Sequence, residues 1–226
     1  MEQTLAQLRV DAVIFDMDGV VIDSGEVYAK HWRDWGAEHG YDYDRDIAPV
    51  HPGRPPAETV RVVAPGLDAE LEARRFNETL DADDAGDDVA AMAGAVELLT
   101  SLPRDRWTIA TSAARGIAPL WLTRAGLPVP DALVTADDID HGKPAPDPYL
   151  RAAALLGMDP ARCLVVEDAP AGVQAAKSAG ATVLALRTTH GPEDLGLADH
   201  HTRGLHTIAV RREDEGLLVS WEPARD

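Results

Sequence analysis

Cysteine and long apolar segments are scarce in this chain of 226 residues. The single cysteine, Cys163, lies in the apolar run 163–166, so a disulfide framework is excluded and a buried, unreactive thiol is expected. No apolar run reaches the roughly 18 residues of a membrane-spanning helix. The first residues show no basic segment followed by an apolar one. We therefore expect a cytoplasmic protein that does not bind membranes.

Positive charge is also scarce, because 21 lysines and arginines face 39 acidic residues and the formal net charge is −18. So acidic a chain is repelled by nucleic-acid phosphates and by anionic lipids, which excludes both as the main partner. An anionic substrate would need a locally positive site. The length fits one domain, or one domain with an insertion.

The most informative segment is the apolar run 12–15, which ends in Asp16-Met17-Asp18-Gly19. The run is typical of a short buried strand, and Gly19 permits a turn directly after it. In an extended segment, Asp16 and Asp18 point to the same side, where two like charges need a cation or a proton between them. The segment indicates a metal site, an acid–base pair or both. An acidic turn without function is the alternative at this point.

Short apolar runs alternate with helix-like stretches over most of the chain. The expected strands are residues 11–15, 107–110, 133–134, 163–166 and 183–186. The expected helices are 116–125 before Gly126, one with Asp147 as N-cap and a stop at Gly157, and one from Pro170 to Gly180. This order predicts an α/β fold with a mostly parallel sheet covered on both faces. Residues 206–210 and 217–221 predict a terminal hairpin.

Between Asp23 and about Ala91 we find helix-like stretches and no convincing strand. These stretches are residues 24–40, 56–64 and 68–80. Asp23 and Glu26 have the spacing of a capping box. An all-helical block at this place predicts a lid above the first acidic segment.

The lid predicts a division into two domains. We expect a catalytic core of residues 1–20 and 91–226 and an α-helical cap of residues 21–90. The two tethers of the cap are expected near residues 19–24 and 81–94.

Three more strand ends carry polar residues. Thr111 and Ser112 follow the second strand, where a hydroxyl and free backbone N–H groups suit a phosphate oxygen, although Thr111 could also cap a helix. Lys143 lies in a loop stiffened by three prolines within five residues, which favours a fixed positive charge. Glu167 and Asp168 follow the run 163–166 as a second acidic pair.

In this order, the four segments resemble the signature of the haloacid dehalogenase-like superfamily of phosphohydrolases. The similarity extends over the whole chain, since the helical insert resembles that superfamily's α-helical cap, and it implies a Rossmann-like three-layer core. Within the superfamily, the chain is most similar to the glycerol-phosphate and 2-deoxyglucose-6-phosphate phosphatase group. The segments that carry this similarity are residues 31–36, 102–115, 142–150 and 167–172.

The resemblance implies a phosphatase that acts through an aspartyl-phosphate. Asp16 would attack phosphorus, and Asp18 would protonate the departing alkoxide and then activate water. Lys143 would supply a positive charge beside the nucleophile. Thr111 and Ser112, with neighbouring N–H groups, would hold the phosphate oxygens.

The resemblance also implies a Mg²⁺ cofactor. Its ligands would be the Asp16 carboxylate, the backbone carbonyl of Asp18 and Asp168, with Glu167 binding through water or steadying the site.

The cap would choose the substrate, which we expect to be a small phosphorylated sugar or polyol. Arg54 is the candidate for substrate contact; the alternative is a surface arginine at a helix start. Trp32 and Trp35, with Tyr28 one turn earlier, are more typical of a cap core than of a binding site. His190 follows the last strand and could lie near the site.

Other activities stay open at this point. A β-phosphoglucomutase-like isomerase would carry a histidine in the cap, where this chain has Tyr28. A phosphoglycolate phosphatase-like hydrolase is the other alternative. A binding module without activity would be expected to have lost Asp16 or Asp18. We expect a monomer or a weak homodimer.

Overall fold

The protein is described here from a computed structural model, which covers residues 5–51, 54–82 and 89–224. Residues 83–88, within the second expected tether of the cap, lie outside the described part, as do residues 52–53. Among the described helices, none combines the length and the apolar character needed to cross a bilayer.

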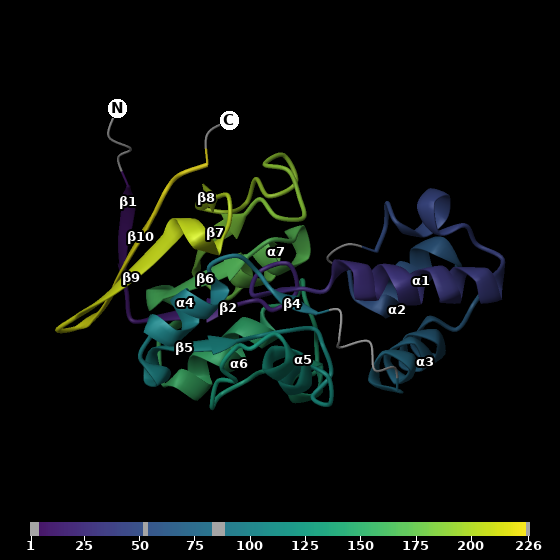
Figure 1. The fold of residues 1–226 in the computed structure, drawn as a ribbon, viewed down its shortest axis with the longest axis horizontal. Coiled ribbons are helices and arrows are strands. Elements are labelled where there is room, and N and C mark those ends of the chain that lie inside the picture. Colours follow the sequence, from purple (N-terminus) through teal and green to yellow (C-terminus); the bar gives the residue numbers. More distant parts are fainter. Residues whose placement is uncertain (1–4, 52–53, 83–88, 225–226) are drawn as a thin grey trace.

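A five-stranded parallel sheet forms the centre of the molecule, as predicted (Figure 1). Its strands in spatial order are β5 (Trp107–Ile109), β2 (Ala12–Phe15), β6 (Cys163–Glu167), β7 (Thr182–Leu186) and β8 (His200–Thr202). Every residue of β2 and β6 is buried, because helices cover both faces of a parallel sheet and leave no polar side. The expected strand 133–134 is reduced to an isolated bridge between Ala110 and Val134.

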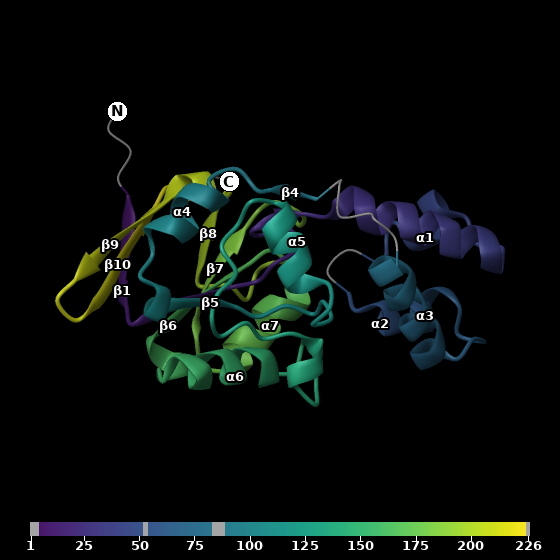
Figure 2. The same cartoon turned by 60° about the horizontal axis from the view of Figure 1, so that its bottom comes forward.

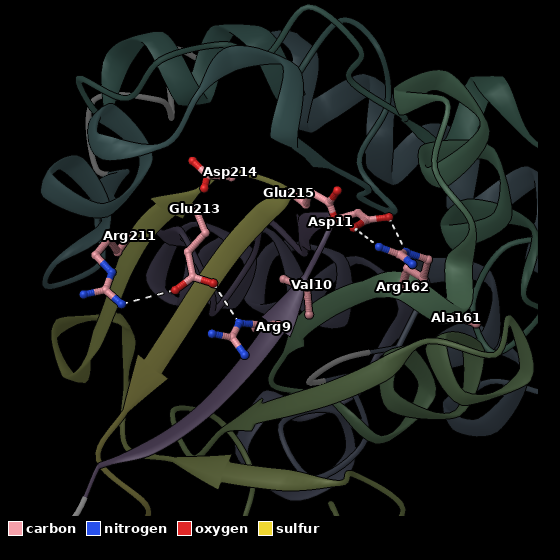
Figure 3. A pocket seen from close by; sticks show the side chains of 9 residues that line it. All are labelled: Arg9, Val10, Asp11, Ala161, Arg162, Arg211, Glu213, Asp214 and Glu215. Atoms are coloured by element: carbon pink, nitrogen blue, oxygen red, sulfur yellow. Dashed lines mark hydrogen bonds and ion pairs between the residues drawn. The ribbon is translucent and has the colours of Figure 1, made fainter.

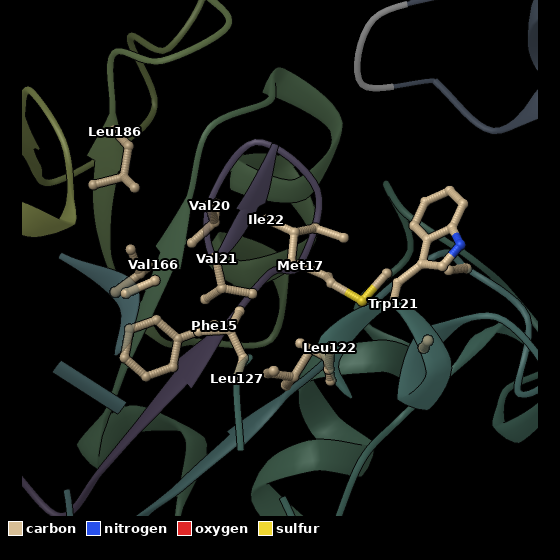
Figure 4. Close-up of a cluster of buried hydrophobic side chains, with 14 of the residues drawn as sticks. Phe15, Met17, Val20, Val21, Ile22, Trp121, Leu122, Leu127, Val166 and Leu186 are labelled. Atoms are coloured by element: carbon tan, nitrogen blue, oxygen red, sulfur yellow. The ribbon is translucent and has the colours of Figure 1, made fainter. Parts of the chain in front are cut away.

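Helices on both faces give the predicted three layers (Figure 2). Alternate residues of β2 point to opposite faces: Ala12 and Ile14 pack with α6 (Asp147–Leu156) and α7 (Pro170–Ser178). Val13 and Phe15 belong to the other cluster, with α4 (Ala95–Ser101) and α5 (Ala118–Arg124). In Figure 4, Phe15 lies beside Val166, and Trp121 and Leu122 of α5 close the same cluster. The sheet is thus held rigidly from both sides.

A second, antiparallel sheet lies at the edge of this core. Its order is β1 (Ala6–Val10), β10 (Gly216–Trp221), β9 (Ile208–Glu213), so the predicted terminal hairpin is confirmed with longer strands. β1 and β8 were not predicted from the sequence. Single 3₁₀ turns cover Arg104–Arg106, Ala136–Asp138, Pro160–Arg162 and Leu205–Thr207.

The block between the first two core strands is helical, as expected, and lies to one side of the sheet (Figure 1). It contains α1 (Gly25–His39), a π-helical turn (Tyr43–Ile47), α2 (Pro56–Val63) and α3 (Ala69–Ala82). The chain enters through β3 (Ile22–Asp23) and returns through β4 (Ala90–Ala91), which pair antiparallel.

Two expected helix caps are wrong. The N-cap of α1 is Ser24 and not Asp23, and the Ser24 hydroxyl donates to Oδ1 of Asp18 instead of capping the helix. The capping box of Asp23 and Glu26 is therefore not formed. α6 begins at Asp147 with Pro146 as its N-cap, and the Asp147 carboxylate contacts Nδ1 of His141 at 3.1 Å instead of capping the helix. The stop at Gly157 is confirmed, with this residue in the left-handed conformation.

Candidate active site

Strand register brings the two acidic segments together. In the parallel pair of β2 and β6, Phe15 lies opposite Val166, and the Asp16 N–H donates to the Val166 carbonyl at 3.0 Å. Asp16 therefore emerges next to Glu167. On the other side, the N–H of Ala110 donates to the Phe15 carbonyl at 2.9 Å, so the segment after β5 ends at the same edge. Ligand sites of open α/β sheets lie at this edge.

Lys143 forms the positive centre of the site. Its Nζ lies 2.7 Å from Oδ1 of Asp16 and 2.7 Å from Oε1 of Glu167, and its side chain is 6% exposed. Burial alone would lower the pKa of Lys143, but the charges of Asp16 and Glu167 outweigh it and raise that pKa. The lysine is thus held as an ammonium between two carboxylates.

Glu167 is fully occupied as an acceptor. Besides Lys143, the Tyr149 hydroxyl donates to Oε1 at 2.7 Å, and Oε2 accepts the N–H groups of Asp168 at 2.8 Å and Ala169 at 3.0 Å. Burial would raise the pKa of Glu167, but the charge and hydrogen bond of Lys143 lower it. A Cβ at Gly172 would lie 1.5 Å from Oε1, so only glycine leaves room for this carboxylate. Glu167 fixes Lys143 in place.

Asp168 has one oxygen without a protein partner. The Thr189 hydroxyl contacts Oδ2, while Oδ1 is buried and has no hydrogen-bond partner among the described residues. An oxygen in that condition is costly unless something else binds it. Carboxylate oxygens of Asp16, Glu167 and Asp168 all lie within 4.8 Å of one another.

The donors and their charge fit a hard divalent cation. Three carboxylates face one lysine, and burial raises the pKa of Asp168 well above its usual value, as the nearby charge of Glu167 does to a lesser extent. Burial likewise raises the pKa of Asp16 to about 7, with Lys143 opposing this only in part. In both groups burial is the main cause and disfavours the charged form, a cost that a bound cation would offset. Oxygen ligands of this type are those that Mg²⁺ prefers.

Asp18 stands apart from that cluster. Its Oδ1 accepts a hydrogen bond from Ser24 at 2.5 Å, and a hydrogen bond with Thr111 also stabilises its charge. Burial nevertheless raises the pKa of Asp18 above its usual value. A carboxyl group in this setting can hold a proton and release it, which suits an acid–base role.

A cavity of about 430 Å³ opens above these groups, between the core and the helical block. From the core, Asp16, Asp18, Ser112 and Lys143 line it, whereas Thr111 is buried beneath and accepts the N–H of Ala113 at 3.0 Å. The sequence-predicted residues Asp16, Asp18, Lys143, Glu167 and Asp168 thus meet at one cavity.

The helical block forms the other wall of the cavity, which we call the cap wall: Tyr28, Arg33, Tyr43, His51 and Arg54. Tyr28 reaches the core, because its ring lies 5.8 Å from that of Trp121 in α5. The Tyr43 hydroxyl lies 3.1 Å from Nε2 of His51, and the Arg33 guanidinium stacks over the Tyr43 ring at 4.6 Å.

The interior of the helical block matches its expected core. Trp32 and Trp35 are 2% and 6% exposed, and the ring centroids of Trp32 and Phe76 lie 4.2 Å apart. Arg54 lines the cavity and is exposed, and no contact of its side chain assigns it a role.

Sequence reasoning missed several residues of the site. Tyr149, Ser24 and Thr189 each bond a carboxylate of the site, and the sequence analysis named none of them as a site residue. His190 lies where it was expected, with Nδ1 3.1 Å from the Asp168 carbonyl oxygen. The rule that found Thr111, a polar residue shortly after a strand end, would also have found Thr189 after β7.

A second depression, of about 910 Å³, lies at the opposite end of β2 and differs in chemistry (Figure 3). Its charged side chains pair with one another: Arg9 with Glu213 at 2.7 Å and Arg162 with Asp11 at 2.5 Å. Arg9 and Arg162 are mostly exposed, so these pairs are screened by water and leave no concentrated charge.

The fold and the buried carboxylate–lysine cluster define a class of phosphoryl-transfer enzymes, and sequence comparison gives that class its name. The sequence model of haloacid dehalogenase-like hydrolases matches residues 10–180, so the chain belongs to this family.

Curated relatives narrow the similarity within the family. Hexitol phosphatase A of Escherichia coli is 33% identical over 94% of this chain and 99% of its own length. Glycerol-1-phosphate phosphohydrolase 2 of Saccharomyces cerevisiae is 34% identical over 80% of this chain and 76% of its own. The yeast 2-deoxyglucose-6-phosphate phosphatase 2 is 28% identical over 95% of this chain and 96% of its own. These relatives confirm the predicted group.

Solved structures agree with the fold. A hydrolase from Pseudomonas syringae, 26% identical, superposes with a TM-score of 0.75 over 87% of this chain and 94% of its own. A β-phosphoglucomutase from Clostridium difficile, at 23% identity and a TM-score of 0.73 over 87% of this chain and 92% of its own, shares the fold.

Proposed function

We propose that the protein is a Mg²⁺-dependent phosphatase that hydrolyses a small sugar or polyol phosphate monoester. The observation that carries this proposal is the cluster of Asp16, Glu167 and Asp168 around Lys143 at the base of a cavity. Curated relatives that act on hexitol and glycerol phosphates support the substrate class.

Catalysis takes place in two displacements. The Asp16 carboxylate attacks phosphorus, the bond from phosphorus to the leaving oxygen breaks, and Asp18 gives that oxygen its proton. Asp18 then takes a proton from water, whose oxygen attacks the aspartyl-phosphate, and the bond between Asp16 and phosphorus breaks to release phosphate. Burial raises the pKa of Asp18, which suits a group that must hold a proton and then release it.

Charge is the main obstacle to the first step. An anionic carboxylate and a phosphate dianion repel by about 4 kcal/mol for each unit pair at 4 Å in a partly screened site. Lys143 offsets part of this repulsion, and Thr111 and Ser112 hold the phosphate oxygens. Carboxylates of Asp16 and Asp168 and the backbone carbonyl of Asp18 would bind Mg²⁺, with Glu167 steadying the site, and the bound ion supplies the remaining positive charge.

The domain assignment supports a small substrate. We assign residues 1–20 and 91–226 to the core and residues 21–90 to the cap, and a cavity of about 430 Å³ between them is too small for a polymer. Arg54 is proposed to contact the substrate from the cap. A cytoplasmic location and a monomer or weak homodimer stay predictions, for fractionation and sedimentation to check.

Tyr28 favours hydrolysis over the mutase reaction, in which the phosphoryl group returns to the sugar. This residue occupies the position that the resemblance assigns to the mutase histidine, and its ring is held between Phe76 and Trp121. No imidazole at this position is available to exchange protons with the substrate.

A phosphate-release screen over small monoesters tests the proposal. Release that needs Mg²⁺ and is lost in Asp16→Asn is expected, with polyol and hexose phosphates as the best substrates. No release from any monoester, by folded protein with metal present, would overturn it. Conversion of β-glucose 1-phosphate to glucose 6-phosphate without free phosphate would establish the mutase instead.

A further inference from the structure

Two consecutive threonines after β7, Thr188 and Thr189, form hydrogen bonds with two different segments of the site. The Thr188 hydroxyl donates to the Gly19 carbonyl at 2.7 Å, and the Thr189 hydroxyl contacts Oδ2 of Asp168. Gly19 ends the first acidic segment and Asp168 ends the second. One short stretch of chain, residues 188–190, therefore contacts both acidic segments through its side chains.

The proton on His190 sets the direction of these hydrogen bonds. Nδ1 of His190 lies 3.1 Å from the Asp168 carbonyl oxygen, which can only accept, so Nδ1 must carry a hydrogen. The same N–H lies 2.9 Å from the Thr189 oxygen, which therefore accepts from it. The Thr189 hydroxyl can then donate to Asp168, whose Oδ2 is nearer to it than the backbone carbonyl oxygen at 3.1 Å.

This chain of donors leaves the two oxygens of Asp168 unequal. Oδ2 accepts the hydrogen bond of the Thr189 hydroxyl. Oδ1 is buried and has no hydrogen-bond partner among the described residues, so both of its lone pairs are available. Gly19 packs directly against this pair, since a Cβ at Gly19 would lie 2.1 Å from Oδ2 and 2.9 Å from Cγ2 of Thr189. Gly19, Asp168 and Thr189 are thus packed closely against one another.

We infer that Thr189 is a positioning residue, which holds Oδ2 of Asp168 so that Oδ1 faces the divalent cation, with His190 orienting the threonine and Thr188 fixing the Gly19 loop. The inference rests on the proposed Mg²⁺ site. Partners that orient a metal-binding group typically change metal affinity by about 10- to 100-fold when they are removed.

Manganese binding, followed by the electron paramagnetic resonance of free Mn²⁺, measures this directly and needs no substrate. Thr189→Val should raise the Mn²⁺ dissociation constant about tenfold or more, whereas Thr189→Ser, which keeps the hydroxyl, should bind like the parent. Thr188→Val, which loosens the loop but leaves Asp168 bonded, should have a smaller effect. Thr189 is exposed, so Thr189→Val is expected to fold, which circular dichroism checks.

Thr123→Val is the matched control. Thr123 is also exposed, and its hydroxyl also donates within the protein, to the Pro119 carbonyl at 2.7 Å in α5. It should bind Mn²⁺ like the parent. Equal affinity of Thr189→Val and the parent would overturn the inference, and so would an equal loss in Thr189→Ser. A parent that binds no Mn²⁺ would instead overturn the proposed function.

Discussion

The two walls of the cavity are built from different chemistry. In the core wall, Asp16, Lys143 and Glu167 are linked by contacts of 2.7 Å, and every group is buried. The cap wall presents aromatic rings and a neutral pair of Tyr43 and His51. Carboxylates and a lysine lie where a phosphate would react, whereas aromatic rings and the two arginines Arg33 and Arg54 lie where the rest of a substrate would bind. The difference separates two tasks: the core wall holds the groups proposed to react, and the cap wall holds the groups proposed to contact the rest of the substrate.

Burial acts in opposite directions on the two walls. It raises the pKa of Asp16 to about 7 and lowers the pKa of His51 to about 4. In both cases burial favours the uncharged form. The core wall overcomes this with a lysine and, as proposed, a cation, whereas His51 stays neutral at pH 7 and donates or accepts hydrogen bonds without attracting anions.

The largest effect is expected when the proposed nucleophile of the core wall is replaced. Asp16→Asn removes the nucleophile, so kcat for phosphate release should fall by at least about 10³-fold, because the covalent step is lost. Steady-state release with Mg²⁺ measures this.

Asp105→Asn, at an exposed acidic residue remote from the cavity, should retain the parent kcat. An Asp16→Asn variant with more than a few per cent of parent activity would show that the core wall does not act through this carboxylate.

A lysine comparison tests how much the core wall depends on its positive centre. Lys143→Met leaves Asp16 and Glu167 buried without their partner, and the free energy of unfolding should fall by about 3–5 kcal/mol. Lys177→Met breaks a more exposed pair with Asp199 and should cost less than about 1 kcal/mol. Urea unfolding measures both. Similar losses in the two variants would contradict the assigned role of Lys143.

Proton and metal should compete at the core wall. Since the folded-state pKa of Asp16 is raised to about 7, its contribution to stability is complete below its unfolded value near 4 and is lost as the pH rises through 7. Without metal, the melting temperature should therefore fall between about pH 5 and pH 8, and the stabilisation by Mg²⁺ should be larger at the higher pH. Scanning fluorimetry with and without Mg²⁺ checks this.

The same scan on Asp16→Asn serves as its control, because a neutral amide at this position should make the dependence flatter. Equal Mg²⁺ stabilisation at both pH values would argue against a metal bound by these carboxylates.

The smallest effect is expected from the cap wall. Tyr28 lines the cavity, and its hydroxyl has no hydrogen-bond partner within the described part of the chain. Tyr28→Phe should raise KM about two- to tenfold with little change in kcat, as expected for one lost substrate hydrogen bond of ~0.5–1.5 kcal/mol.

Tyr41→Phe is the matched control, because Tyr41 stacks on Trp35 inside the cap and does not line the cavity. Its KM should equal that of the parent. A large loss of kcat in Tyr28→Phe would show that the two walls do not divide their tasks as described.

The sequence predicted the parts of the fold that local pattern determines. Buried parallel strands read as continuous apolar runs, so β2 and β6 and the acidic residues after them could be found in advance. β1 was not predicted, although its five residues alternate between apolar and polar, because so short a segment becomes a strand through its partner β10, which lies more than two hundred residues away. β8 has the sequence His-His-Thr and becomes a strand only through its pairing with β7.

The site was predictable to the same extent. Asp16, Lys143 and Asp168 stand at strand or loop ends with charges that need an explanation. Tyr149 lies within a helix and resembles any core tyrosine, and only the folded structure shows that its hydroxyl reaches Glu167. The direction of the Ser24 hydroxyl, toward Asp18 and away from its own helix, likewise depends on tertiary packing.

The short pairing of β3 with β4 has a mechanical consequence. Ile22 lies opposite Ala91 and Asp23 opposite Ala90, and the Met92 N–H donates to the Val21 carbonyl at 3.0 Å. The outgoing and returning strands are therefore joined side by side, and they cannot slide past each other without breaking these bonds. The pairing therefore fixes the register of the two connecting strands immediately before α1, the helix that carries Tyr28.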